Sequence, residues 1–278
     1  MALVINTNIA SLEAQRNLAH SQNALATTFQ KLSSGMRINT AADDASGLAI
    51  SENMQAQIRS FGTAERNANN AVSMAQVAEG ALGQMSSILS RMRELAVQGA
   101  NGDLSSTDRA YMNTEFVSLR DEIDRLSQST KFNGKDLLSG PSTSIDFQVG
   151  INNTAADKIS VTFGNVTLNA LGINASTVDG ADATNSLASI DAIENAITTI
   201  SGRRADYGAV MNRLQLTVAN TQSMRTNLSA ANSRIRDVDV AEETASMARN
   251  QVLSQAGVSV LSQANQAPQL ALKLLGGG

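Results

Sequence analysis

The stretch AERNANNAVSMAQVAEGALGQMSSILSRMRELA, residues 64–96, decides how this chain folds. Steps of four and three residues along it reach only apolar side chains: Ala64, Ala68, Ala71, Ala75, Ala78, Leu82, Met85, Leu89, Met92 and Ala96. A seam with this spacing, sustained over four heptads, is typical of a long α-helix that buries one face continuously. The two prolines, Pro141 and Pro268, both lie outside the stretch, so no strong helix breaker interrupts it.

Two further seams extend the helical pattern on the C-terminal side. The first comprises Met112, Phe116, Leu119, Ile123 and Leu126. The second comprises Ile190, Ile193, Ile197, Ile200, Tyr207, Met211, Leu214, Val218, Leu228 and Ile235, with Arg204, Thr221, Arg225 and Asn232 interrupting its register. Polar residues in a seam can fix helix register and partner choice at some cost in stability. These segments therefore predict a helical bundle.

The two ends of the chain carry weaker seams. Near the N-terminus, Leu25, Phe29, Leu32 and Met36 keep heptad spacing. Near the C-terminus the corresponding positions are Leu253, Gly257, Val260, Ala264, Ala267, Ala271 and Leu274. Such narrow seams bury little apolar surface, and isolated amphipathic helices are marginal in water. We expect both ends to become ordered only on assembly with neighbours.

The middle of the chain has a different pattern. Apolar and polar residues alternate at Ile145, Phe147 and Val149, and again at Ile159, Val161 and Phe163, which indicates two short strands or a hairpin. The expected fold class is therefore mainly α: a long helical bundle with a small β-hairpin element and a terminal coiled coil formed by the N- and C-terminal helices.

Composition excludes several classes of function. The 21 basic and 25 acidic residues give a net charge of -4, which offers no electrostatic footprint for nucleic acid or an anionic membrane. No segment approaches a membrane span, and no cleaved secretion signal is visible at the start. Cysteine is absent, so thiolate chemistry and disulfides are excluded.

Candidate catalytic residues are few. The single histidine, His20, lies among polar residues and is better explained as solvated or interfacial than as a catalytic or zinc-binding group. The adjacent carboxylates Asp43 and Asp44 are better explained as caps of a helix N-terminus than as metal ligands or acid–base groups. We therefore predict no cofactor, no metal and no enzymatic activity.

Several motifs together resemble bacterial flagellin. They are residues 5–8 (INTN), 32–39 (LSSGMRIN), 43–50 (DDASGLAI), 93–98 (RELAVQ), 132–134 (FNG) and 264–269 (ANQAPQ). The resemblance covers about residues 1–170 and 187–275. It implies an extracellular structural subunit that polymerises into the flagellar filament for motility and leaves the cell through the flagellar export channel without a cleaved signal.

The resemblance also implies a domain organisation. Residues 1–43 with 236–278 would form the terminal coiled-coil assembly domain of an inner tube, and residues 44–170 with 187–235 the helical core domain. Residues 171–186 would be a short surface connector in place of the outer domains of longer members.

The implied partners are other copies of the chain, the export machinery and its chaperone, and hook-associated and cap proteins. Family members also present a surface recognised by host Toll-like receptor 5, and the matching positions are Arg91, Leu95 and Glu115.

Two alternatives remain at the level of sequence, and a third is excluded. A hook–filament junction protein shares the terminal patterns but does not form long polymers. A non-flagellar coiled-coil adaptor would keep the seams but would not need residues 43–50 or the strands. A flagellin-like scaffold with a zinc protease insert needs two histidines, which this chain does not have.

Overall fold

The structure, a computed structural model, describes residues 7–275, and the side chains of residues 7–266. The chain forms two units. The terminal unit consists of the described residues of Met1–Ala56 and Asn227–Gly278, and the central unit of Gln57–Thr226. The expected fold class is confirmed: long helices dominate, and the strands are confined to two small antiparallel hairpins.

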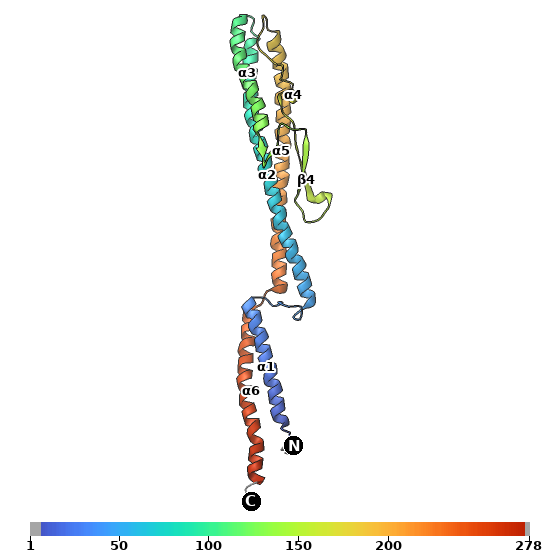
Figure 1. Cartoon of the computed structure of the whole chain (residues 1–278), viewed down its shortest axis with the longest axis vertical. Helices are drawn as coiled ribbons and strands as arrows, with labels where there is room; N and C mark the ends of the chain where they lie inside the picture. Colours follow the sequence, from blue (N-terminus) through green and yellow to red (C-terminus); the bar gives the residue numbers. More distant parts are fainter. Residues whose placement is uncertain (1–6, 276–278) are drawn as a thin grey trace. The chain divides into compact units, whose positions relative to one another are not determined.

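The central unit is built on three helices that lie side by side: α2 (Ala45–Gly99), α3 (Ser106–Ser129) and α5 (Thr184–Arg236) (Figure 1). All ten predicted seam residues from Ala64 to Ala96 are buried, which confirms the period read from the sequence. The bulkier part of this seam, Leu82 to Met92, packs against Phe116 and Ile123 of α3 and Ile193 and Ile200 of α5. The alanines at the other end of the seam allow α2 and α5 to approach closely.

Helix starts follow local sequence signals. Ser105 and Asp108 form a capping box at α3, in which the Ser105 side chain accepts from the Asp108 N–H and the Asp108 carboxylate accepts from the Ser105 N–H. Asp44 caps α2 by accepting from the Gly47 N–H at 2.8 Å, as predicted. These bonds satisfy donors that a helix leaves free in its first turn.

The predicted hairpin is also confirmed. Strand β3 (Thr143–Gln148) pairs antiparallel with β4 (Lys158–Phe163), placing Ile145 opposite Val161 and Phe147 opposite Ile159. A one-turn 3-10 helix, Ala155–Asp157, lies between them. Alternate residues of β4 are buried, so one face of the hairpin closes over the helices.

A second, smaller hairpin pairs β1 (Lys131–Phe132) with β2 (Lys135–Asp136). Its two-residue turn is Asn133-Gly134, with φ of 48° and 76°. Positive φ at both residues is the geometry of the type I′ turn, which favours Asn-Gly.

The segment 171–186 differs from the surface connector expected for it. It follows a short helix, α4 (Leu168–Leu171), and buries Leu171, Ile173 and Val178 in the main core. The polar residues around these three suggested a surface loop, but single apolar residues spaced along a loop can still anchor it. The segment is a lid on the core rather than an external link.

Two of the polar residues in the α5 seam reach across to α2. Arg204 pairs with Glu79 at 2.8 Å and Arg225 with Glu65 at 2.8 Å. Thr221 is buried, and the Asn232 side-chain oxygen is buried with no hydrogen-bond partner among the described residues. The seam thus carries paired charges at its edges and a few polar groups inside.

The terminal unit contains two more helices, α1 (Ile9–Ser34) and α6 (Val240–Leu275), together with the adjacent ends of α2 and α5. Asn8 caps α1, and Gly35, with φ of 69°, ends it in the left-handed conformation that glycine adopts without strain. Asp239 caps α6 by accepting from the N–H groups of Ala241 and Glu242.

Candidate assembly surface

Helices α1 and α6 lie side by side and antiparallel (Figure 1). The Asn8 side chain donates to the Ala264 carbonyl at 2.8 Å, and the Ser11 hydroxyl donates to the Asn265 side chain at 2.7 Å. Midway along the pair, a Cβ added at Gly257 would lie only 3.3 Å from the Leu18 side chain. Glycine therefore permits a close approach of the two helices at this point.

The seam between α1 and α6 has a register of its own. On α1 the covered positions are Ser11, Ala14, Leu18, Ser21, Leu25, Thr28 and Leu32. On α6 they are Glu243, Met247, Asn250, Ser254, Gly257, Leu261 and Ala264. Both sets keep the alternating three- and four-residue steps of a coiled coil. About half of these residues are polar, so the pair buries little apolar surface for its length.

The residues predicted to mediate assembly are divided by this seam. Leu25, Leu32, Met36 and Ala264 are half-buried within the chain. Phe29, Leu253 and Val260 are 66%, 49% and 54% exposed. Ala267, Ala271 and Leu274 lie outside the residues whose side chains are described. The predicted heptads therefore mix the seam of the pair with its outer face.

The large apolar side chains of the terminal helices lie mainly outside the pair. On α1 they are Ile9, Leu12 and Phe29, and on α6 they are Val240, Val252, Leu253, Val258 and Val260. The predicted heptads do not separate the two faces, because they combine seam residues such as Leu25 and Gly257 with outer residues such as Phe29. The weaker period of small and polar residues, from Ser11 to Leu32, is the signal that marks the internal seam.

The base of the pair is tied by main-chain bonds. Met36 and Asp237 form an isolated antiparallel bridge, and the Val238 N–H donates to the Gly35 carbonyl at 3.1 Å. The Arg37 guanidinium donates to the Ile235 carbonyl at 2.7 Å. These contacts fix where the chain leaves α1 and where it enters α6.

Asp43 organises the turn that follows. Its carboxylate accepts from the main-chain N–H groups of Thr40 at 2.8 Å and Asn39 at 3.1 Å, and from the Thr40 hydroxyl. These bonds, the Thr40 N–H first, hold the pKa of Asp43 below its usual value because they stabilise the carboxylate. Asp44 thus caps α2, as the sequence predicted, whereas Asp43 stabilises the turn before the helix instead of the helix N-terminus.

The three receptor-related positions lie on α2 and α3 of the central unit. Arg91 bonds the carboxylates of Glu115 at 2.9 Å and Glu94 at 3.0 Å, and these bonds, Glu115 first, raise the Arg91 pKa. Arg91 and Glu115 are solvent-accessible, whereas Leu95 is only 2% exposed and belongs to the main core. The structure therefore brings Arg91 and Glu115 together on the surface and places Leu95 beneath them.

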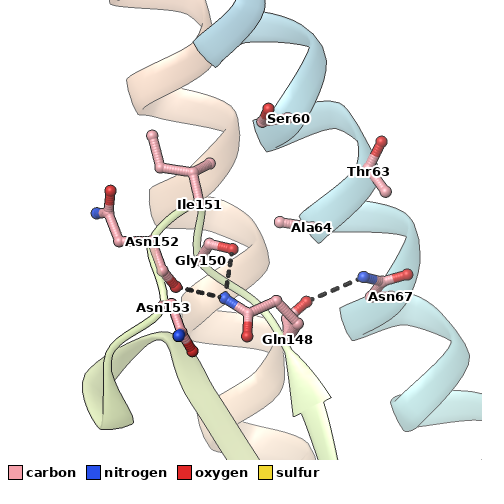
Figure 2. Close-up of a pocket in the computed structure, with 9 residues that line it drawn as sticks. All are labelled: Ser60, Thr63, Ala64, Asn67, Gln148, Gly150, Ile151, Asn152 and Asn153. Atoms are coloured by element: carbon pink, nitrogen blue, oxygen red, sulfur yellow. Dashed lines mark hydrogen bonds between the residues drawn. The ribbon is translucent and has the colours of Figure 1, made fainter.

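A groove of about 410 Å³ lies where the loop after β3 passes α2 (Figure 2). Asn67 of α2 donates to the Gln148 carbonyl at 3.1 Å, and the Gln148 amide donates to the carbonyls of Gly150 and Asn152. Its lining contains hydroxyl and amide groups but no titratable side chain. This groove therefore lacks the acid and base that proton-transfer catalysis requires.

Metal and membrane sites were also sought. Within residues 7–275, no three histidine, aspartate or glutamate side chains come together as a metal ion would require. No helix in the described part of the chain is long and apolar enough to cross a bilayer.

Comparison with protein families matches two models, one toward each end of the chain. Residues 5–143 match the bacterial flagellin N-terminal helical region, and residues 190–275 match the bacterial flagellin C-terminal helical region. The chain belongs to the bacterial flagellin family. The segment between the two matches carries the lid and, apart from Thr143, both strands of the β3–β4 hairpin.

Curated flagellins match along their whole length. A flagellin of Halalkalibacterium halodurans is 43% identical over 273 residues, covering 98% of this chain and 100% of the relative. The flagellar filament 33 kDa core protein of Treponema phagedenis is 40% identical, again covering 98% and 100%. A flagellin of Bacillus subtilis is 40% identical, covering 98% of this chain and 99% of the relative.

Two solved structures share the fold. Bacillus cereus flagellin matches with a TM-score of 0.50 and 32% identity, covering 60% of this chain and 94% of that one. A putative flagellar hook-associated protein from Vibrio parahaemolyticus matches with a TM-score of 0.58 over 70% of this chain and all of that one, but at 19% identity. The fold is thus shared beyond flagellins, and it is the sequence that assigns the family.

Proposed function

We propose that this chain is a structural subunit of the bacterial flagellar filament and that subunits join through the terminal unit. The observation that carries the proposal is the outward position of the large apolar side chains on α1 and α6. Together with the flagellin family match, this indicates that the terminal helices have their remaining partners in other copies of the chain.

The energetics favour assembly through the terminal helices. Full burial of one Val, Leu or Phe side chain contributes roughly 1.5–3 kcal/mol. Eight such side chains on α1 and α6 are substantially exposed in the single chain, so neighbours can supply most of the hydrophobic stabilisation of these helices. Neighbours would cover α1 and α6 with different patches of their own surface. Heterologous contacts that do not close into a ring generate helical filaments.

The central unit is the part of each subunit that the contacts between terminal helices would hold in place. Its continuous core from Met74 to Tyr207 does not depend on neighbours. Residues 1–43 with 236–278 are accordingly the proposed assembly domain of the inner tube, and residues 44–170 with 187–235 are the proposed helical core domain. The protein acts by packing and not by catalysis.

The remaining partners follow from the family resemblance. They are the export machinery and its chaperone, which would carry the chain outward without a cleaved signal, and the hook-associated and cap proteins at the filament ends. For Toll-like receptor 5, Arg91 and Glu115 are the positions available for contact, while Leu95 supports the helix beneath them.

Truncation tests the proposal directly. Removal of residues 1–35 or 240–278 should leave a soluble, helical central unit that does not polymerise, as seen by circular dichroism and by electron microscopy after seeding. Long filaments from either truncated chain would contradict the proposal. The full chain should form long filaments on seeds, whereas a hook–filament junction protein would give short polymers or none.

A matched pair of point variants locates the joint more finely. Phe29→Ser removes an exposed aromatic side chain from α1, and Tyr111→Ser removes one that is similarly exposed, at 74%, from α3. The first variant should need a higher concentration to polymerise, and the second should polymerise like the parent. If Tyr111→Ser needed the higher concentration instead, the contact between subunits would lie on the central unit.

A further inference from the structure

Arg109, in the first turn of α3, is a buried cation with neutral partners. It is 2% exposed. Its guanidinium donates to the main-chain carbonyls of Gly99 at 2.9 Å, Asn101 at 2.9 Å and Ala181 at 3.3 Å. No carboxylate lies within ion-pair distance of it in the described part of the chain. A buried charge is normally paired, so this guanidinium is poised for an anion.

The neighbouring Asp182 carboxylate is engaged elsewhere. It accepts from the Thr184 main-chain N–H at 3.0 Å. That bond, and to a smaller extent the charge of Arg109, lowers the pKa of Asp182. Arg109 therefore influences this carboxylate only at a distance.

One carbonyl acceptor of Arg109 belongs to an Asn-Gly dipeptide, Asn101-Gly102, in the exposed turn between α2 and α3. An Asn side-chain amide can be attacked by the main-chain nitrogen of the next residue, which closes a five-membered succinimide ring. Glycine as the next residue has no Cβ to hinder the attack. The Arg109 guanidinium draws electron density from the Asn101 carbonyl, and so makes the Gly102 N–H that must lose its proton more acidic.

We propose that Asn101 is a self-modification site at which the chain converts asparagine to isoaspartate, and that Arg109 directs the product. The Gly102 nitrogen bonds to Cγ of Asn101, and ammonia leaves with the Gly102 proton. Water then opens the ring at the original main-chain carbonyl carbon, the one that Arg109 polarises. The net change is the addition of one water and the loss of one ammonia, with no oxidant or reductant.

The product supplies the anion that Arg109 lacks. Ring opening at that carbon reroutes the main chain through Cβ and Cγ and leaves the former main-chain carbonyl as a free carboxylate. This carboxylate carries the oxygen that already lies 2.9 Å from the guanidinium. The hydrogen bond from the guanidinium to a neutral carbonyl oxygen thereby becomes a pair of opposite charges, an arginine with a carboxylate, which is the stronger kind of contact. The modification goes beyond the filament role and does not depend on it.

A second Asn-Gly dipeptide in the same chain provides an internal reference. Asn133-Gly134 forms the two-residue turn between β1 and β2, with positive φ at both residues. Within the described part of the chain, none of Arg109, Arg120 and Arg125 donates to its main-chain carbonyl. Ring closure there requires the turn geometry to be lost, and ring opening lacks a guanidinium to direct it.

The experiment is peptide mapping of the purified full-length chain, aged at neutral pH, by mass spectrometry that separates aspartate from isoaspartate. Asn101 should convert several times faster than Asn133. The formal net charge should pass from -4 to -5 as one neutral residue becomes acidic, giving a more acidic band on isoelectric focusing. Equal conversion at the two sites, or no conversion at Asn101, would overturn the proposal.

Two comparisons test the mechanism without risk to the fold. Gly102→Ala introduces a Cβ with nothing within 4 Å, so it should slow conversion at Asn101 several-fold and leave Asn133 unchanged. The chain unfolded in guanidinium chloride gives the undirected ratio of isoaspartate to aspartate, and the folded chain should exceed that ratio at Asn101 only. An unchanged rate in Gly102→Ala, or an unchanged ratio on folding, would refute the mechanism.

The role of Arg109 has its own readout. In folded Arg109→Gln, checked by circular dichroism, the isoaspartate ratio at Asn101 should fall to that of the unfolded chain. A ratio that stays at the parent value would show that Arg109 does not direct the ring opening. If this variant does not fold, the comparison of folded and unfolded parent chains still decides the proposal.

Discussion

Replacement of Gly257 by valine should weaken filament assembly while leaving the central unit intact. An added Cβ at this position would lie 3.3 Å from Cδ1, 3.6 Å from Cβ and 3.8 Å from Cα of Leu18. The two further methyl groups of valine must then push α1 away from α6. Overpacking of this kind costs typically about 1–3 kcal/mol. The better helix propensity of valine offsets only a few tenths of this cost, roughly 0.3 kcal/mol.

If this cost falls on the assembled state, the critical concentration for polymerisation rises roughly 5- to 150-fold, since about 1.4 kcal/mol is a factor of ten. Sedimentation of seeded polymer at graded subunit concentrations measures it. Gly257→Ala adds only the Cβ and gains about 1 kcal/mol of helix propensity. Unlike Gly257→Val, it should therefore polymerise at least as well as the parent chain. Gly202→Val is the matched control, because nothing lies within 4 Å of a Cβ there. Parent-like polymerisation of Gly257→Val would show that the α1–α6 seam is not needed in the filament.

Three further variants test the core of the central unit, the turn at Thr40 and the start of α2. Leu89→Ala, at a fully buried position, should lower the free energy of unfolding by about 2–5 kcal/mol in thermal melts followed by circular dichroism. A loss below about 1 kcal/mol would mean that the core is not packed as described. Asp43→Asn should destabilise the turn at Thr40 at neutral pH. A carboxylate whose pKa is lowered by folding stabilises the folded state at a pH above its unfolded pKa of 3.8, and this contribution is lost as the pH falls through the folded pKa. The melting temperatures of the parent and the variant should therefore differ at neutral pH and converge at acidic pH. Gly47→Ala should cost about 0.5–2 kcal/mol, because its Cβ would displace the capping Asp44 side chain, and hydrogen exchange at the start of α2 should rise accordingly.

The long apolar seams could be predicted because each is encoded locally. The run from Ala64 to Ala96 fixes its own buried face, and all of its members are buried. The hairpin could be predicted for the same reason, since alternation at Ile145 and Phe147 matches alternation at Ile159 and Val161. In both cases one period dominates the segment, so no competing face exists.

The seam of the terminal pair could not be chosen from sequence because two periods compete there. One runs through Phe29, Leu253 and Val260 and is the more apolar, yet it lies outside the pair. The other, through Leu18 and Gly257, is smaller and more polar, yet it lies inside. The choice depends on how closely two helices can approach, which is a property of the pair and not of either helix.

The lid at residues 171–186 was missed for a related reason. Most of its residues are polar, which predicts a surface loop. The buried side chains of Ile173 and Val178 nevertheless hold the segment against the core. Leu95 shows the opposite difficulty: its spacing from Arg91 on α2 indicates the same stretch of surface, but the core of the central unit claims its side chain. Isolated apolar residues are assigned to core or surface by neighbours that are distant in sequence.

If subunits join through the terminal unit, as proposed, the inner and outer faces of the α1–α6 pair would have separate roles. A terminal pair with a strongly apolar internal seam would be stable alone. Its large apolar side chains would then be buried inside the pair and could not contact neighbouring subunits. A pair held by Ser11, Asn8 and the close approach at Gly257 is specific in register but weak in stability. Its large side chains remain available outside, so stability at the ends of the chain is gained when subunits meet. Hydrogen exchange should therefore be fast in α1 and α6 of the monomer and slow in the filament, with little change in α2 near Leu89, and equally slow exchange in both states would contradict this account.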